Sequence, residues 1–294
     1  MTPSSSRRPA VPSPSATLVL VRERLGSVEV YLLRRSAASS FMPGTSVFPG
    51  GSLEDADRHT AFWLNHVDVD ELRLPPILGG AVDRMLPYAV AAVRETWEEA
   101  GHLLGSCPGA EIEAFRGNKR PPAFHRWAAR LDIRLSISVI GRWSRWITPE
   151  SMPRRFDTYF FMAPVQIEAN CRPDRREAVH GLWIDIRQAL VENARGSLCL
   201  SPPTLVTLHQ MLPYGNLDEL LAESRRRLWP PPFMPRLWPL QKGDLIVEPW
   251  DPDYAGGTVN VDIDRLERDI LPVGAPFSRM WRHRGVCRPV ARVG

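Results

Sequence analysis

Three glutamates and one arginine form the pattern in this sequence that could carry out chemistry. Residues 94–101 read Arg-Glu-Thr-Trp-Glu-Glu-Ala-Gly. In a helix, Glu95, Glu98 and Glu99 share one face, because they are three or four positions apart. Like charges on one face repel each other, so the pattern predicts either a solvated acidic surface or a cation site. A hard divalent cation such as Mg²⁺ prefers carboxylate oxygens and keeps water molecules for contacts with substrate phosphates.

The helix that must position these side chains is predicted over residues 87–100. Pro87 suits the first turn of a helix, and Gly101 suits its end. An apolar stripe with the spacing i, i+3, i+7 runs along the same segment and would face the core. The residues of this stripe are Val90, Val93 and Trp97. We therefore expect the glutamates on the opposite face of the helix.

A glycine turn upstream points to a specific chemistry. Residues 48–51 read Phe-Pro-Gly-Gly, and two glycines allow a tight turn or a close backbone approach. Together the turn and the acidic segment resemble the signature of the Nudix hydrolases, G-x5-E-x7-R-E-U-x-E-E-x-G-U, in which U is apolar. Asp57 stands where the signature has glutamate, and 36 residues separate it from Arg94, where the signature has seven. The resemblance therefore implies a Nudix box with an insertion at residues 58–86.

Further segments resemble one branch of that family, the acyl-coenzyme A diphosphatases of peroxisomal type, which carry an insertion inside the box. Residues 32–36 read Leu-Leu-Arg-Arg-Ser, and residues 41–44 read Phe-Met-Pro-Gly. Downstream, residues 146–149 read Trp-Ile-Thr-Pro, and residues 153–158 read Pro-Arg-Arg-Phe-Asp-Thr. A related coenzyme A signature has arginine four residues after the serine, where this chain has Ser40.

The resemblance implies an α+β fold, with a mixed sheet sandwiched between helices in an α/β/α arrangement. We expect a disordered tail over residues 1–15, because this segment lacks core-forming residues. The Nudix domain is expected over residues 16–194, followed by a helical and irregular extension over residues 195–294. Apolar runs and turn residues predict strands over residues 16–21, 28–33, 136–142 and 158–165, and helices over residues 124–130, 186–193, 202–212 and 217–228. β-like stretches are also indicated over residues 245–265.

By the same resemblance, Glu95, Glu98 and Glu99 would bind Mg²⁺ or Mn²⁺. The backbone carbonyl of Gly50 or Gly51 could complete the metal shell, since glycine lets the backbone approach closely. The cations would neutralise the diphosphate and lower the pKa of a bound water molecule.

Arginine and carboxylate partners would hold the box in shape. Arg94 would orient the glutamates and pair with Asp57, although Glu54 or Asp55 could take that place after the insertion. The general base is left open between a box glutamate and Glu177, which lies in a later loop. The candidate catalytic residues are thus Arg94, Glu95, Glu98 and Glu177.

Substrate contacts are expected from Arg35, Phe48 and Gly50, which lie in the segments that resemble the family. Other arginines could hold substrate phosphates; these are Arg34, Arg154 and Arg155. Phe41 and Met42 could line a path for pantetheine or an acyl group, or could simply pack in the core. Two tryptophans are expected in the core, Trp143 and Trp146.

The function implied by the resemblance is hydrolysis of coenzyme A or acyl-coenzyme A to 3′,5′-ADP and (acyl) 4′-phosphopantetheine. A hydrolase of ADP-ribose or of a nucleotide sugar is the alternative within the same chemistry. A non-catalytic nucleotide-binding regulator is the alternative of another class, and the intact set of three glutamates argues against it.

Composition limits the other classes. The chain has 294 residues, of which 44% are hydrophobic and 24% charged, as in globular proteins. No apolar run approaches the length of a membrane span, and no secretory signal is visible, so we expect a cytoplasmic protein without a membrane partner. The arginines are scattered, which argues against nucleic acid as a partner. The resemblance implies a small-molecule nucleoside diphosphate as substrate. The chain ends in Ala-Arg-Val-Gly, not in the peroxisomal Ser-Lys-Leu. Whether the chain forms a homodimer is left open.

Overall fold

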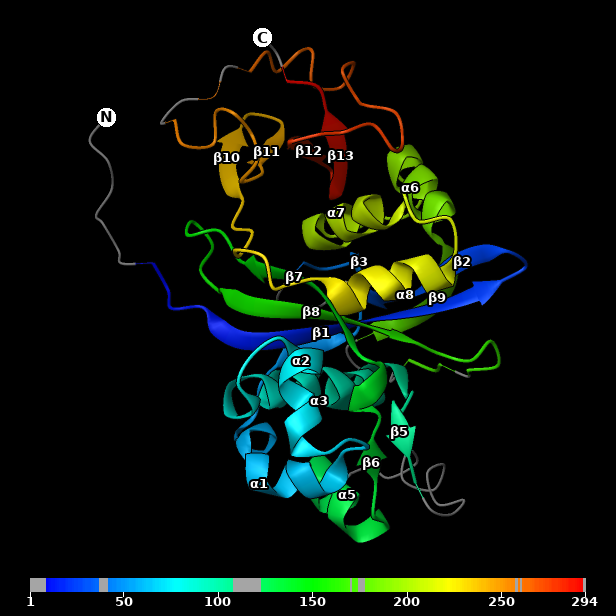
Figure 1. Cartoon of the computed structure of the whole chain (residues 1–294). Helices are drawn as coiled ribbons and strands as arrows, with labels where there is room; N and C mark the ends of the chain where they lie inside the picture. Colours follow the sequence, from blue (N-terminus) through cyan, green and yellow to red (C-terminus); the bar gives the residue numbers. More distant parts are fainter. Residues whose placement is uncertain are drawn as a thin grey trace.

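The molecule has a central sheet with helices on both faces and a second, smaller sheet above it (Figure 1). The computed structural model describes residues 9–36, 42–107, 123–169, 171–173, 178–256, 259 and 261–292. The predicted α+β architecture, with a mixed sheet between helical layers, is confirmed. None of the helices in these described ranges is long and apolar enough to cross a membrane.

The central sheet is built around β1 (Ser13–Arg24). β1 pairs antiparallel with β2 (Ser27–Arg35) and with the short β4 (Gly50–Ser52), and parallel with β8 (Phe156–Pro164). β7 (Gly141–Ile147) extends the sheet beyond β8, and β3 (Ser46–Val47) and β9 (Ala178–Asp185) pair with β2. The hairpin predicted at residues 16–33 is therefore confirmed. β1 is apolar over most of its length because both of its faces are covered.

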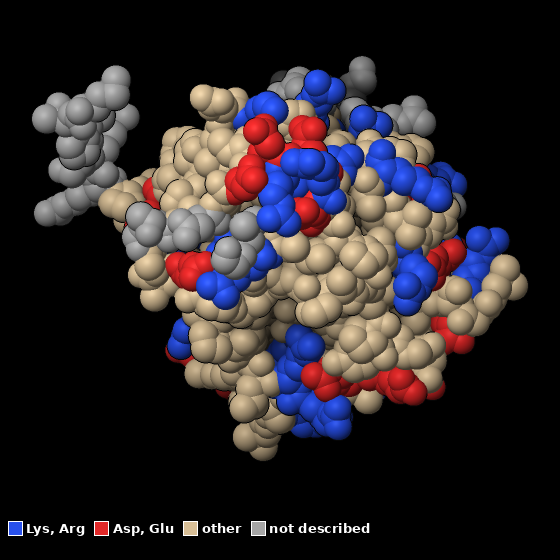
Figure 2. Space-filling view, turned by 90° about the horizontal axis from the view of Figure 1, so that it is seen from above, with Lys and Arg blue, Asp and Glu red and all other residues tan. Residues whose placement is uncertain are grey.

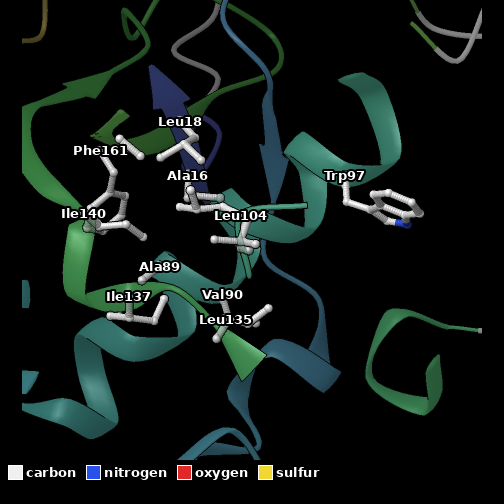
Figure 3. Packing of buried hydrophobic residues seen from close by; sticks show 14 of the residues in the cluster. Ala16, Leu18, Ala89, Val90, Trp97, Leu104, Leu135, Ile137, Ile140 and Phe161 are labelled. Carbon is white, nitrogen blue, oxygen red and sulfur yellow. The ribbon is translucent and has the colours of Figure 1, made fainter. Parts of the chain in front are cut away.

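The lower layer in Figure 1 is dominated by α3 (Val82–Ala100), which carries the box glutamates. The predicted stripe is buried: Val90 and Val93 are fully enclosed, and Trp97 stacks on Trp127 with 4.8 Å between ring centroids. Figure 3 shows Val90 directed into the packed centre and Trp97 directed away from the sheet.

The start of α3 was predicted wrongly. The helix begins at Val82, five residues before the predicted start, and Pro87 lies inside it. Proline in a helix interior removes one backbone hydrogen bond. Met85 and Leu86, which belong to the added turn, are buried in the core, and this burial offsets the missing bond.

The insertion folds as short helical segments against α3. It contributes Trp63, Leu74 and Leu78 to the core, all fully buried. The helices of this layer are α1 (Thr60–Trp63), α2 (Leu74–Leu78) and α5 (Phe124–Leu131), with 3-10 turns at Asp55–Arg58, Leu64–His66, Glu71–Arg73 and Ile137–Val139. A small ladder of β5 (Gly105–Ser106) and β6 (Arg134–Leu135) adjoins them.

The upper layer holds α6 (Ile186–Arg195), α7 (Pro202–Met211) and α8 (Leu217–Arg226), close to the predicted bounds. Above them lies an antiparallel second sheet. Its strands, in spatial order, are β10 (Arg236–Leu240), β11 (Gly243–Val247), β12 (Arg279–His283) and β13 (Val286–Val290). Seen from above, this side of the molecule is largely uncharged, with basic and acidic residues in mixed groups (Figure 2).

Three expectations from the sequence need correction. The extension over residues 195–294 is helical only in its first part, and the second sheet follows. Residues 13–15 do not belong to a tail, because they pair with β8 as the start of β1. The strand predicted at residues 136–142 instead contains a 3-10 turn at Ile137–Val139, and β7 starts only at Gly141.

Candidate active site

Arg94 is the centre of the candidate site. It is 2% exposed, and its guanidinium donates hydrogen bonds to both oxygens of Asp57, with Nε–Oδ1 at 3.0 Å and Nη2–Oδ2 at 2.9 Å. Nη1 donates to Glu95 Oε1 and to Glu98 Oε2, each at 2.9 Å. The Glu54 carboxylate is farther away, with 3.9 Å between its Oε1 and Arg94 Nη1. The structure thus has Asp57 as the main acidic partner, across the whole insertion.

Burial and neighbouring charges shift the pKa of Arg94 in opposite directions. Burial lowers the pKa of Arg94, but the hydrogen bond to Asp57 and the charge of Glu95 outweigh it, so the net shift is upward. Arg94 therefore stays charged. Its Nη1 atom holds one oxygen of Glu95 and one oxygen of Glu98 by hydrogen bonds.

The glycine turn touches the glutamates directly. The Gly50 amide donates to Glu99 Oε2 at 2.9 Å. A Cβ atom at Gly51 would overlap the carboxylate of Glu95, so only glycine fits there without movement. The Gly51 carbonyl accepts a hydrogen bond from Ser15 Oγ at 2.6 Å. The turn and the acidic face of α3 thus form one cluster.

The three glutamates differ in exposure. Glu99 is 8% exposed, whereas the side chain of Glu95 is 15% exposed and that of Glu98 is 45% exposed. Burial is the main cause that raises the pKa of Glu95, to about 7, and the neighbouring charge of Glu98 raises it further. Burial also raises the pKa of Glu98. Closely spaced acids with raised pKa values are typical of functional sites.

The donor set fits a hard divalent cation. In the described part of the chain, no three acidic, histidine or cysteine side chains already converge at metal-binding distance. The Arg94 nitrogen instead holds the nearest oxygens of Glu95 and Glu98. Carboxylates with one backbone carbonyl are nevertheless the ligands that Mg²⁺ and Mn²⁺ prefer.

The cluster opens into a cavity of about 500 Å³. This volume lies within the usual range for small-molecule sites. All predicted metal-site residues and the three main predicted substrate contacts line it; these are Arg35, Phe48, Gly50, Gly51, Glu95, Glu98 and Glu99, and Arg94 lines it as well. Met42 and Arg154 also face the cavity.

Two of the other arginines predicted to hold substrate phosphates are not part of this cavity. Arg34 does not line it, and Arg155 is buried and donates to the backbone oxygens of Thr148 and Ala10. Trp146 lies in the core as predicted, at 4% exposure, but it also lines the cavity. Glu177, the candidate base, and Phe41 lie outside the described residues.

The residues that line the rest of the cavity were not predicted from the sequence. Ser15 and Thr17 of β1 and Thr158 of β8 lie on the upper face of the sheet, where a core position would be apolar. Polar residues at alternate positions of otherwise apolar strands were the available signal. β-like stretches were indicated over residues 245–265, which include Ile246, but nothing in the sequence placed Leu237, Ile246 or Arg282 at the cavity.

Comparison with solved structures gives the class of protein. A NUDIX hydrolase from Alicyclobacillus acidocaldarius superposes with a TM-score of 0.59 at 27% identity, over 72% of this chain and 96% of that one. Fold and site together are those of a Nudix hydrolase.

The family model for the NUDT19 Nudix domain matches residues 10–211, and the chain belongs to this family. A relative from Gallus gallus, described as acyl-coenzyme A diphosphatase NUDT19, is 28% identical over 86% of this chain and 81% of its own length. The Homo sapiens protein of the same description is 29% identical over 64% of this chain and 62% of its own length.

Proposed function

We propose that this protein hydrolyses the diphosphate bond of coenzyme A or acyl-coenzyme A, with Mg²⁺ or Mn²⁺ as cofactor. The products would be 3′,5′-ADP and (acyl) 4′-phosphopantetheine. The observation that carries the proposal is the cluster of Glu95, Glu98, Glu99 and the glycine turn at one end of a large cavity. The two NUDT19 relatives that share this domain are described as acyl-coenzyme A diphosphatases.

The metal ligands would be the three box glutamates and the Gly51 carbonyl. A cation bound there would neutralise the diphosphate and acidify a water molecule. Arg94 restrains Glu95 and Glu98, so that their carboxylates do not need to be ordered when substrate binds. Phosphoryl transfer depends mainly on positioning and charge neutralisation, so no nucleophilic side chain is required.

The base that takes the proton from the attacking water would be a box glutamate or Glu177. Glu98 is the most exposed of the three glutamates and faces the cavity. Arg35 lines the same cavity and would contact a substrate phosphate. A guanidinium suits this role because it can bind phosphate through two parallel hydrogen bonds.

A substrate panel tests the proposal. Purified protein with Mg²⁺ or Mn²⁺ would be assayed on coenzyme A, acyl-coenzyme A, ADP-ribose, NADH and diadenosine polyphosphates. We expect the highest kcat/KM on coenzyme A or its acyl esters, with 3′,5′-ADP released. A higher kcat/KM on ADP-ribose would overturn the substrate assignment, and no hydrolysis of any compound would favour a nucleotide-binding regulator.

A further inference from the structure

The second sheet forms part of the same cavity as the box glutamates. Leu237 of β10 and Ile246 of β11 line it, together with Pro235 just before β10. Figure 1 shows why: the second sheet lies above the central sheet, on the side opposite α3. The box therefore forms one end of the cavity and the second sheet covers another part of it.

The floor of the covered part is the upper face of the central sheet. β1 and β8 run parallel in a register that places Ser15 beside Thr158 and Thr17 beside Phe160. Side chains two positions apart point to the same face, so these four residues lie together. All four line the cavity. Farther along β1, Val19 is packed in the upper core, so the cavity ends where apolar packing begins.

The covered part is poorly equipped to recognise a nucleobase. Among the described residues that line the cavity there is no Asn, Gln, Asp or His, and all four glutamates belong to the box region. The hydroxyl of Ser15 is bonded to the Gly51 carbonyl, and that of Ser201 lies 2.8 Å from the hydroxyl of Thr204. Selective recognition of polar groups needs hydrogen-bonding partners in the site.

The one cation that the second sheet contributes is neutralised. Arg282 of β12 donates two hydrogen bonds to Asp244 Oδ2, at 3.1 and 2.7 Å. The other side chains that the strands of the second sheet contribute, Leu237 and Ile246, are apolar. The floor adds Phe160 beside the hydroxyl-bearing Ser15, Thr17 and Thr158. Such a surface suits a chain of methylene groups.

We propose that the covered part of the cavity takes the acyl chain of the substrate, and that Leu237 and Ile246 set the chain length that is accepted. This inference rests on the proposed function, since it assigns one part of an acyl-coenzyme A to one part of the cavity. Each methylene buried there would raise kcat/KM about fourfold, until the chain reaches the second sheet.

The test compares variants of the second sheet on coenzyme A and on its short-, medium- and long-chain acyl esters. Ile246→Trp and Leu237→Trp fill the cavity, and Ile246→Ala enlarges it. The Trp variants should lose about tenfold or more in kcat/KM on long chains, while coenzyme A changes less than about threefold. Ile246→Ala should shift the preferred chain to a longer one.

Leu240→Ala is the matched control. Leu240 belongs to β10 but packs in the other cluster of the second sheet, with Leu245 and Trp281, and does not line the cavity. It should leave the chain-length profile unchanged. Thermal unfolding of each variant identifies those that fail to fold, and the milder Ile246→Ala then carries the test.

The outcomes separate this inference from the proposed function. If the parent protein hydrolyses no acyl-coenzyme A, the proposed function fails and this inference fails with it. If the parent is active but all variants keep its chain-length profile, only the inference is overturned. Equal losses on coenzyme A and on all acyl esters would place the nucleoside in the covered part, which also overturns it.

Discussion

At the scale of single residues, the site depends on one buried cation that serves several acids. Arg94 bonds Asp57 on one side and the oxygens of Glu95 and Glu98 on the other. The side chain of Asp57 is 1% exposed, so it has no access to water if its partner is lost. The Arg94 side chain therefore contributes both to the stability of the fold and to the placement of the box glutamates.

Replacing Arg94 should destabilise the fold. In Arg94→Met, Asp57 keeps its burial but loses its partner, and breaking a buried pair from one side costs about 3–5 kcal/mol. Urea unfolding would measure this loss. Arg195→Met is the control, because its pair with Glu192 has an arginine side chain that is 70% exposed, and such pairs contribute about 1 kcal/mol or less. Equal losses in both variants would contradict the assignment.

Removing one negative charge from the box should stop turnover without unfolding the protein. In Glu98→Gln and Glu99→Gln, we expect kcat to fall about 100-fold or more, since a charged ligand for the cation is lost. Steady-state kinetics with Mg²⁺ and a thermal unfolding curve would be measured for each. Glu71→Gln, in an exposed 3-10 turn of the insertion, should match the parent. If either variant keeps the parental turnover, the glutamate that it replaces is not a metal ligand.

At the scale of elements, the two glycines of β4 have different tasks. A Cβ atom at Gly50 would overlap backbone atoms of Ala16 and Thr17, whereas one at Gly51 would meet only the movable carboxylate of Glu95. Backbone cannot give way at low cost, but a side chain can rotate. The first glycine is thus needed for strand pairing and the second for the placement of an acid.

This difference predicts opposite phenotypes. Gly50→Ala should lower the free energy of unfolding, by about 1–3 kcal/mol as in other overpacked sites. Gly51→Ala should unfold near the parental temperature but require more Mg²⁺ for half-maximal activity, because Glu95 is displaced. Gly215→Ala, where the nearest atom is 3.6 Å away, is the neutral control. The interpretation fails if Gly51→Ala keeps the parental Mg²⁺ requirement.

The same elements show what the sequence could predict. The helical spacing of the glutamates and the apolar stripe gave the correct face of α3, and the hairpin of β1 and β2 followed from its apolar runs. The β-like stretches at residues 245–265 overlap β11, but the other strands of the second sheet were not predicted, and Pro239 and Pro289 interrupt two of them. Both prolines lie in β10 and β13, the two edge strands, where a missing donor is tolerated. The cavity residues of this sheet were missed with it, because only tertiary packing places them beside the box.

At the scale of the whole molecule, an unpaired acid lies buried at the end of β11. Glu248 is fully buried, and neither of its carboxylate oxygens has a hydrogen-bond partner. Burial raises its pKa to about 8, from 4.5. The folded state therefore keeps a proton that the unfolded chain releases, so Glu248 makes the protein less stable as pH rises.

The pH dependence of unfolding tests this. Between about pH 4.5 and pH 8, the contribution of Glu248 to the free energy of unfolding should fall by about 1.4 kcal/mol per pH unit. Glu248→Gln cannot ionise, so it should gain stability over the parent at pH 8 and match it more closely at pH 5. Urea unfolding at both pH values would show the difference. A stability gap that is independent of pH would contradict the assignment.

The span of the cavity along the chain, from Ser15 to Arg282, bears on when the site forms during synthesis. Domains fold as the chain leaves the ribosome, N-terminal parts first. A chain translated only to α7 carries the glycine turn and all three glutamates, but it lacks Leu237 and Ile246, which line the cavity from the second sheet. The lining of the pocket is complete only when β10, β11 and β12 have been translated. A partly synthesised chain would therefore hold the box glutamates before it could enclose an acyl chain.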